Sequence, residues 1–117
     1  MVTDIKRGDI VIVNLDPARG SEQKGIRPAL IIQNDEGNMH SSTTIIAPIT
    51  SQIFKREFPT NVNLLRNESK LEKDSLILFN QITTIDKIRI FKKISTLNDS
   101  LMKKVDLAIK ASLGLDF

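Results

Sequence analysis

The chain has 117 residues, enough for one domain, residues 1–117, with a hydrophobic core of its own. It contains no cysteine, which excludes disulfides, thiolate metal sites and cysteine nucleophiles. The net charge of +3 is compatible with an anionic partner and equally with ordinary solubility, while five Phe without Trp or Tyr disfavour a platform of aromatic rings for stacking bases.

The first half of the chain predicts short strands separated by polar connections. From Gly8 onward the predicted order is a strand over 9–15, a loop over 16–25, a strand over 27–35, a turn over 36–42 and a strand over 43–51. The loop is long for so small a domain, and such loops are usually functional or mobile. Pro48 cannot donate a backbone hydrogen bond, which predicts an edge or bulge position for its strand.

The second half continues with strands and ends in a helix. The predicted order is a polar connection over 52–60, a strand over 61–65, one helical turn within 68–74, a strand over 75–82 that could continue to 86, a turn over 86–89 and a strand over 90–95. Apolar residues then recur at helical spacing, with Asn98 as the expected N-cap and Gly114 as the expected stop. These elements predict a mainly β protein, an antiparallel sheet or small barrel with one packed helix.

Several chemistries fit the composition poorly. The only histidine, His40, stands in a polar turn, where a solvated surface residue is the more common occurrence. No HExxH, EF-hand or P-loop pattern is present, and the carboxylates occur singly. No metal and no cofactor are therefore predicted. The sequence also lacks a signal peptide or an apolar run of the ~20 residues that a membrane span needs, so we expect a soluble, cytoplasmic protein.

Arg27 stands at the start of an apolar strand, directly after the long loop. Pro28 favours an extended backbone at Arg27, and a planar guanidinium can make bidentate contacts to phosphate. Local sequence leaves two possibilities open, a solvated strand end and a phosphate ligand. Thr50 at the end of the strand over 43–51 is similarly ambiguous, because threonine is also a common β-former.

The order of several motifs resembles the MazF/PemK toxins of bacterial toxin–antitoxin pairs. The motifs are RGDIVIVNLDPARGSEQKGIRPALIIQND, TTIIAPITSQI, FPTNV, DSLILFNQITTIDKIRI and LMKKVDLAIKASLGL, and the most specific element is GSEQKGIRP followed by APIT. The resemblance implies an SH3-like antiparallel β-barrel with a C-terminal α-helix, acting as a homodimer. It further implies a sequence-specific, metal-independent endoribonuclease that cuts single-stranded RNA, chiefly mRNA, and a MazE-like antitoxin as partner.

The resemblance also implies roles for individual residues. The catalytic Arg and Thr of the family correspond to Arg27 and Thr50. The positions that correspond to RNA-contacting residues of the family are Ser21, Glu22, Gln23, Lys24, Gly25, Asn34, Phe58, Pro59, Thr60 and Gln81. Asn80 and Thr83 depart from the residues that many members carry there, so the cleavage sequence cannot be transferred.

The chemistry implied is attack by a ribose 2′-OH on the adjacent phosphate, giving a 2′,3′-cyclic phosphate and a free 5′-OH. Arginine is a poor general base, so Glu22 is an alternative base, although Glu22 could equally be a solvated loop residue without a catalytic role.

Two rival functions remain open. One is a barrel-fold toxin that binds a protein target such as DNA gyrase, and the other is a non-catalytic RNA-binding module.

Overall fold

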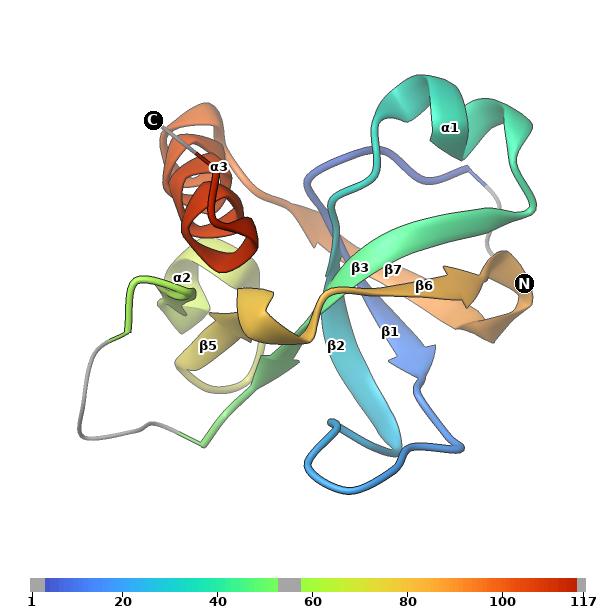
Figure 1. Ribbon diagram of the computed structural model, residues 1–117, viewed down its shortest axis with the longest axis horizontal. Coiled ribbons are helices and arrows are strands. Elements are labelled where there is room, and N and C mark those ends of the chain that lie inside the picture. Colours follow the sequence, from blue (N-terminus) through green and yellow to red (C-terminus); the bar gives the residue numbers. More distant parts are fainter. Residues whose placement is uncertain (1–3, 53–57, 116–117) are drawn as a thin grey trace.

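The computed structural model describes residues 4–52 and 58–115, in which seven strands form one curved antiparallel sheet (Figure 1). The strands are β1 (Asp9–Asn14), β2 (Ile26–Ile31), β3 (Thr43–Thr50), β4 (Asn61–Leu64), β5 (Ser75–Leu78), β6 (Thr83–Asp86) and β7 (Ile90–Thr96). The helices are α1 (Asp35–His40), α2 (Arg66–Ser69) and α3 (Asp99–Leu113), and two 3₁₀ turns are η1 (Phe79–Gln81) and η2 (Lys87–Arg89). None of the described helices is long and apolar enough to cross a membrane.

The strand order confirms a mainly β, barrel-like fold with a C-terminal helix. Neighbouring strands follow the order β4-β5-β3-β2-β1-β7, and β6 also pairs with β3. The pairings within the described residues do not close this path into a complete ring. The predicted connection over 52–60 lies largely outside the described residues.

The central strands carry apolar side chains on both faces, because successive residues of a strand point to opposite sides. One cluster includes Ile10, Leu30 and Ile49 and packs against the buried face of α3. The other includes Val11 and Ile31 and packs on the opposite face of the same strands. The two clusters hold β1, β2 and β3 between them, which makes these strands a rigid support for the loops at their ends.

The C-terminal helix has the predicted limits. The Asn98 side chain accepts a hydrogen bond from the backbone N–H of Leu101 at 2.9 Å, and Gly114 ends the helix with φ 71°. Leu101, Val105 and Ala108 are the buried residues of α3. Both terminal signals are local in sequence, and both were predicted correctly.

The expected strand over 75–82 is confirmed as far as Leu78, the end of β5, and is wrong beyond it, because the chain leaves the sheet at η1. The expected continuation to residue 86 is a separate strand, β6. The pair Ile49–Ile77 joins β3 to β5, and the pair Ile46–Thr83 joins β3 to β6. Between these pairs β3 advances by three residues and the partner segment by six, so the extra residues form the 3₁₀ turn. Pro48 lies opposite this interruption and cannot donate a hydrogen bond to a continuous strand there.

Two smaller predictions are also wrong. Of the two positions expected for Pro48, the edge position is wrong, because its strand has β2 on one side and β5 and β6 on the other. The proline lies instead where the pairing of β3 changes from β5 to β6. The turn over 36–42 contains the short helix α1. The Asn34 side chain accepts a hydrogen bond from Gly37 N at 2.8 Å and caps that helix.

Candidate functional site

Arg27 lies near the start of β2, directly opposite Val13 of β1. Its side chain is half-buried, and its Nε donates a hydrogen bond to the carbonyl oxygen of Lys24 at 2.6 Å. Within the described residues this is the only hydrogen bond of the guanidinium, so the two terminal nitrogens have no protein partner. The extended backbone expected from the following proline is present.

Thr50 ends β3 and is buried, with 4% of its surface exposed. Its Oγ1 accepts a hydrogen bond from Gln52 N at 3.1 Å, which fixes the first turn after the strand. β2 and β3 pair with Ala29 opposite Pro48, and the same register continued by two residues sets Arg27 opposite Thr50. Directly opposed residues point to the same face of a sheet, so the continued register places the two predicted catalytic residues on one face of adjacent strands.

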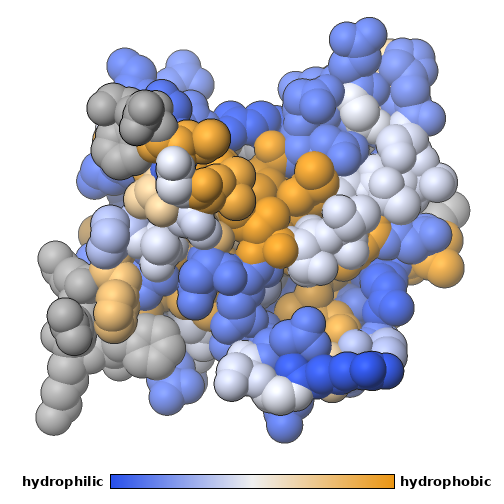
Figure 2. All heavy atoms as spheres, in the orientation of Figure 1, coloured by the Kyte–Doolittle hydropathy of each residue, from blue (hydrophilic) through white to orange (hydrophobic). Residues whose placement is uncertain are grey.

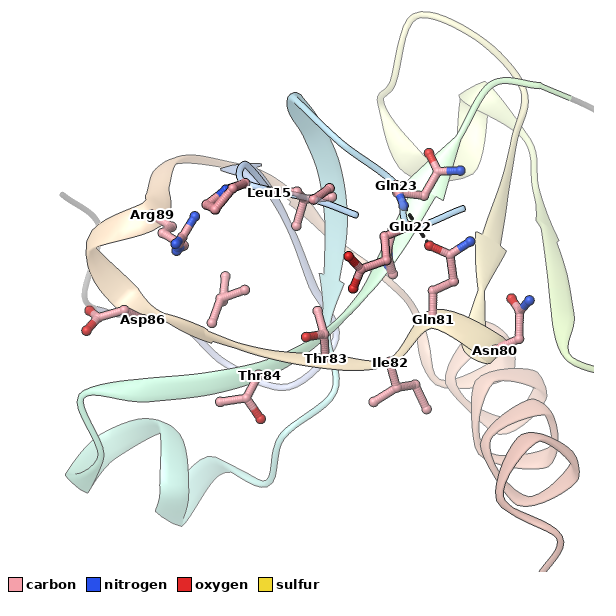
Figure 3. Close-up of a pocket in the computed structure, with 14 residues that line it drawn as sticks. Leu15, Glu22, Gln23, Asn80, Gln81, Ile82, Thr83, Thr84, Asp86 and Arg89 are labelled. Atoms are coloured by element: carbon pink, nitrogen blue, oxygen red, sulfur yellow. Dashed lines mark hydrogen bonds between the residues drawn. The ribbon is translucent and has the colours of Figure 1, made fainter. Parts of the chain in front are cut away.

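The side chain of Gln81 in η1 binds the backbone of the loop between β1 and β2 (Figure 3). Its Oε1 accepts a hydrogen bond from Gln23 N at 2.8 Å, and its Nε2 donates to Ser21 O at 3.4 Å. Gly25 closes the loop with φ 80°, and its N–H donates to the Asp16 carboxylate at 3.0 Å. The predicted loop residues are therefore joined to Gln81 by hydrogen bonds, directly before the start of β2.

Glu22 is exposed and bends back onto its own loop. Its carboxylate accepts a hydrogen bond from Arg19 N at 2.5 Å, and its backbone N–H donates to Arg19 O at 3.0 Å. The neighbouring Gln23 Oε1 is buried without a hydrogen-bond partner among the described residues. One carboxylate and one unsatisfied amide oxygen thus lie together in the part of the loop that precedes Arg27.

A cavity of about 570 Å³ opens between this loop and the segment from η1 to η2 (Figure 3). We call it the amide pocket. Its lining residues are Leu15, Pro17, Ala18, Glu22, Gln23, Pro48, Asn80, Gln81, Ile82, Thr83, Thr84, Ile85, Asp86 and Arg89. The lining combines amide, hydroxyl and carboxylate groups with apolar side chains, which is a suitable environment for a flat molecule with hydrogen-bonding edges.

Arg89 is a lining residue that the sequence did not reveal. It donates hydrogen bonds to the carbonyl oxygens of Asn14, at 3.2 Å, and Asp16. These contacts hold the exit of β1 against the far end of the amide pocket. The partners are more than 70 residues away along the chain, and no local sequence signal indicates such a contact.

The remaining predicted RNA-contacting residues lie apart from Arg27 and Thr50. Asn34 follows β2 at the end opposite to Arg27 and caps α1. Pro59 lines a separate groove between β4 and α3, and the Thr60 carbonyl oxygen accepts a hydrogen bond from Phe79 N at 2.9 Å. Phe58 precedes them at the same edge and is 44% exposed. None of these positions lines the amide pocket beside Gln81 in the described part of the chain.

Asp35, which lies away from this site at the start of α1, has a lowered pKa. The backbone N–H of Arg7 lowers the pKa of Asp35 below its usual range. The described residues contain no group of three His, Asp or Glu side chains arranged to hold a metal ion.

Comparison with known proteins places this geometry in a family. The sequence pattern of the family described as "PemK-like, MazF-like toxin of type II toxin-antitoxin system" matches residues 6–113. A protein named Endoribonuclease MazF from Staphylococcus saprophyticus is 50% identical over 111 residues, which are 95% of this chain and 92% of that protein.

Solved structures agree on the fold. A mycobacterial endoribonuclease in complex with its cognate antitoxin superposes with a TM-score of 0.80 at 22% identity, over 97% of this chain and 98% of that chain. The Mycobacterium tuberculosis toxin MazF-mt6 gives a TM-score of 0.79 at 25% identity, over 93% and 99%. The chain belongs to the PemK-like, MazF-like family of toxins of type II toxin–antitoxin systems.

Proposed function

We propose that this protein is an endoribonuclease toxin that cuts single-stranded RNA, chiefly mRNA, at specific sequences and without a metal ion. The observation that supports this most is the register that sets Arg27 opposite Thr50, beside the Gln81-anchored loop. The 50%-identical relative named as an endoribonuclease supports the reaction class. We further propose that residues 1–117 act as one toxin domain in the cytoplasm, where mRNA is found.

In the proposed reaction a ribose 2′-oxygen attacks the adjacent phosphorus. The new O2′–P bond forms as the P–O5′ bond breaks, the 2′-OH loses a proton, and the leaving 5′-oxygen gains one. The products are a 2′,3′-cyclic phosphate and a 5′-OH. Because the nucleophile belongs to the RNA, the protein needs neither a serine or cysteine nucleophile nor a metal-activated water.

Arg27 would stabilise the negative charge that develops on the phosphate oxygens. Its Nε is bound to Lys24 O, which fixes the plane of the guanidinium and leaves the two terminal nitrogens for a bidentate phosphate contact. Thr50 would donate its hydroxyl hydrogen to the same phosphate, since Oγ1 accepts, and does not donate, in its bond with Gln52 N. Such preorganised donors act on the transition state.

The site has few groups that could accept the proton of the 2′-OH or donate one to the leaving 5′-oxygen. A guanidinium stays protonated at any working pH and is a poor general base. Glu22 is the carboxylate within the loop segment from Ser21 to Gly25, and its bond to Arg19 N would have to be given up for it to reach the 2′-OH. A Glu22→Gln variant that cleaves RNA at the parental rate at every pH tested would eliminate Glu22 as the base.

The amide pocket is the proposed site for reading RNA bases. Glu22 and Gln23 of the loop line it together with Gln81, Asn80 and Thr83. The other predicted loop contacts, Ser21, Lys24 and Gly25, are proposed to bind RNA outside the pocket. Asn34 and the segment from Phe58 to Thr60 are proposed as more distant RNA contacts, and they would require a strand that extends beyond the pocket. The residues of this family member at 80 and 83 would then contribute to its own cleavage sequence.

The central experiment incubates the purified protein with a long single-stranded RNA in EDTA and maps the new ends. We expect discrete cuts with 5′-OH ends. Loss of either donor typically costs ~3 kcal/mol of transition-state stabilisation, so Arg27→Ala and Thr50→Val should each lower kcat/KM by roughly a hundredfold or more. Thr50→Ser keeps the hydroxyl and serves as the control.

The same experiment separates the rival functions. Intact RNA that is tightly retained by the protein would favour a non-catalytic RNA-binding module. Intact RNA without binding would favour a toxin with a protein target such as DNA gyrase. Cleavage that requires added Mg²⁺ would contradict the metal-independent reaction.

We also propose a MazE-like antitoxin and a second copy of this chain as partners. The solved relatives include MazE–MazF complexes from Deinococcus radiodurans, although at about 20% identity these support the fold alone. A cognate antitoxin added in equal amount should abolish RNA cleavage, and undiminished cleavage would contradict this assignment.

A further inference from the structure

A second cavity, of about 650 Å³, borders Arg27 on the side of the loop away from the amide pocket. We call it the basic groove. Its charged lining residues are Lys24, Arg27, Lys70, Lys73, Lys92 and Glu72. Five cations therefore face one carboxylate in a chain whose total net charge is only +3. Positive charge is concentrated beside the proposed catalytic arginine.

The floor of the basic groove is a row of residues across the sheet. Lys92 of β7 pairs with Ile12 of β1, and Ile12 pairs with Pro28 of β2. The register between β2 and β3 continues this row to Ile49. The row is apolar except for Lys92 at its end. An apolar wall of low dielectric strengthens the field of the charges around it.

The far wall of the basic groove is the connection from α2 to β5. Lys70 ends α2 in a left-handed backbone conformation with φ 63°, and its N–H donates to Arg66 O at 2.9 Å. The Ser95 hydroxyl donates to Ser69 O, which joins this connection to β7. The backbone that carries Lys70 is thus held in position relative to the sheet.

The lysines of the basic groove lack an acidic partner among the residues that the structure describes. Within the described residues neither Lys24, Lys70, Lys73 nor Lys92 forms a salt bridge, whereas the adjacent Lys93 pairs with Asp9 at 3.3 Å. The amide pocket differs, because its charged residues are Glu22, Asp86 and Arg89. The loop between β1 and β2 separates a cationic cavity from one that is close to neutral.

We propose that the basic groove binds the phosphate backbone of the RNA strand on one side of the phosphate that is cut. This inference rests on the proposed function. Arg27 lines the groove at its border, whereas the floor is made by its neighbour Pro28 and by Ile12, whose side chains point to the other face of the sheet. A strand whose reacting phosphate contacts Arg27 therefore reaches Lys70, Lys73 and Lys92 by passing around the start of β2. The bases on the other side of the loop lie near the amide pocket. The groove binds strands irrespective of their sequence, and the pocket selects among them.

The test compares the double variant Lys70→Gln/Lys73→Gln with the wild-type chain. The probe is a fluorescent single-stranded RNA of mixed sequence with 2′-O-methyl riboses, which removes the nucleophile and allows equilibrium binding. Kd is measured by anisotropy from 50 to 300 mM salt. The matched control is Lys103→Gln/Lys110→Gln, which removes two exposed charges of α3 outside both cavities.

For single strands the slope of log K against log salt is about −0.7 per phosphate contact, so the double variant should lose about 1.4 from the slope. The corresponding loss of affinity is about tenfold at 150 mM salt. Cleavage should show a raised KM with kcat and the cut sequences unchanged, as expected for uniform binding. The control variant should bind and cleave like the wild type.

Three outcomes overturn the proposal. An unchanged slope and Kd in the groove variant, with wild-type cleavage intact, would refute the groove while the proposed function stands. An equal loss of RNA affinity in the control variant would show that affinity depends on the overall charge of the protein and not on the basic groove. If the groove variant bound RNA like the wild type but bound an oligoglutamate peptide more weakly, the groove would be assigned to an acidic protein partner. Failure of the wild-type protein to cut any RNA would instead refute the proposed function.

Discussion

Gln81 connects two segments that lie 58 residues apart along the chain. Its side-chain amide binds the loop backbone with both of its polar atoms, accepting from Gln23 N and donating to Ser21 O. In the free protein the residue therefore has a defined positioning role, in addition to the RNA contact that we propose. A residue that holds the loop also controls where Lys24 O, and with it the Arg27 guanidinium, is placed.

Gln81→Leu should loosen the loop without unfolding the protein, because the side chain is only partly buried. We expect faster amide hydrogen exchange at Gln23 in the absence of RNA, together with a lower kcat. Asn80→Leu is the matched control for the exchange measurement alone, since Asn80 is exposed and has no hydrogen bond to the loop within the described residues. If exchange at Gln23 were unchanged in Gln81→Leu, the positioning role would be wrong and only a direct RNA contact could remain.

At the scale of elements, α1 is joined to the segment before β1. The Asp35 carboxylate accepts hydrogen bonds from Arg7 N at 2.6 Å and from Asn38 Nδ2 at 3.3 Å. The Arg7 guanidinium also donates to Ile32 O at 3.0 Å and to Asp106 of α3 at 2.6 Å. The bond from Arg7 N is the largest cause that lowers the pKa of Asp35 in the folded protein. The ionised carboxylate is therefore part of the native connection.

A carboxyl group whose pKa is lower in the folded than in the unfolded state stabilises the fold above its unfolded value, near 3.9, and loses that effect as the pH falls through the folded value. Asp35→Asn should lower the free energy of unfolding by about 1 kcal/mol at pH 7, since the exposed site limits the gain from a charged hydrogen bond. The deficit should shrink between pH 5 and pH 2.

Thermal unfolding of both proteins at several pH values measures this difference. Glu36→Gln is the control, because Glu36 is on the same helix and makes no hydrogen bond to Arg7. A deficit of Asp35→Asn that stayed constant down to pH 2 would show that the carboxylate charge does not contribute.

The whole molecule leaves apolar side chains exposed around α3. Leu107, Leu113 and Leu115 are between 53% and 59% exposed. Figure 2 shows hydrophobic side chains gathered beside α3 and across the middle of one face. Monomeric soluble proteins rarely expose large contiguous apolar surfaces, and such surfaces commonly mark protein–protein contacts. The apolar set of α3 is broader than the packing within one chain requires, which supports the proposed homodimer.

Sedimentation equilibrium at micromolar concentration should therefore give a mass of about twice the 13.1 kDa of one chain. The mass should decrease toward the monomer on dilution and should not rise beyond the dimer with concentration, which distinguishes a closed dimer from aggregation. A single species at the monomer mass throughout the micromolar range would contradict the homodimer.

Local sequence was sufficient to predict the elements whose start, period and end depend only on residues a few positions away. The period of α3, its cap at Asn98 and its stop at Gly114 were all readable, because each depends on neighbours in the chain. The strands β1, β2 and β3 were readable from their apolar runs. The extended backbone at Arg27 followed from the proline after it. These features do not depend on the distant strands that each element eventually meets.

The arrangement of the site was decided by the tertiary structure. Pairing of β2 with β3 sets Arg27 opposite Thr50, and the break at Pro48 directs Asn80 and Gln81 out of the sheet toward the loop. The basic groove combines lysines from the loop, from the connection between α2 and β5, and from β7. Strand register and side-chain contacts between distant segments depend on how the whole sheet packs, and the local pattern around any one residue does not contain that information.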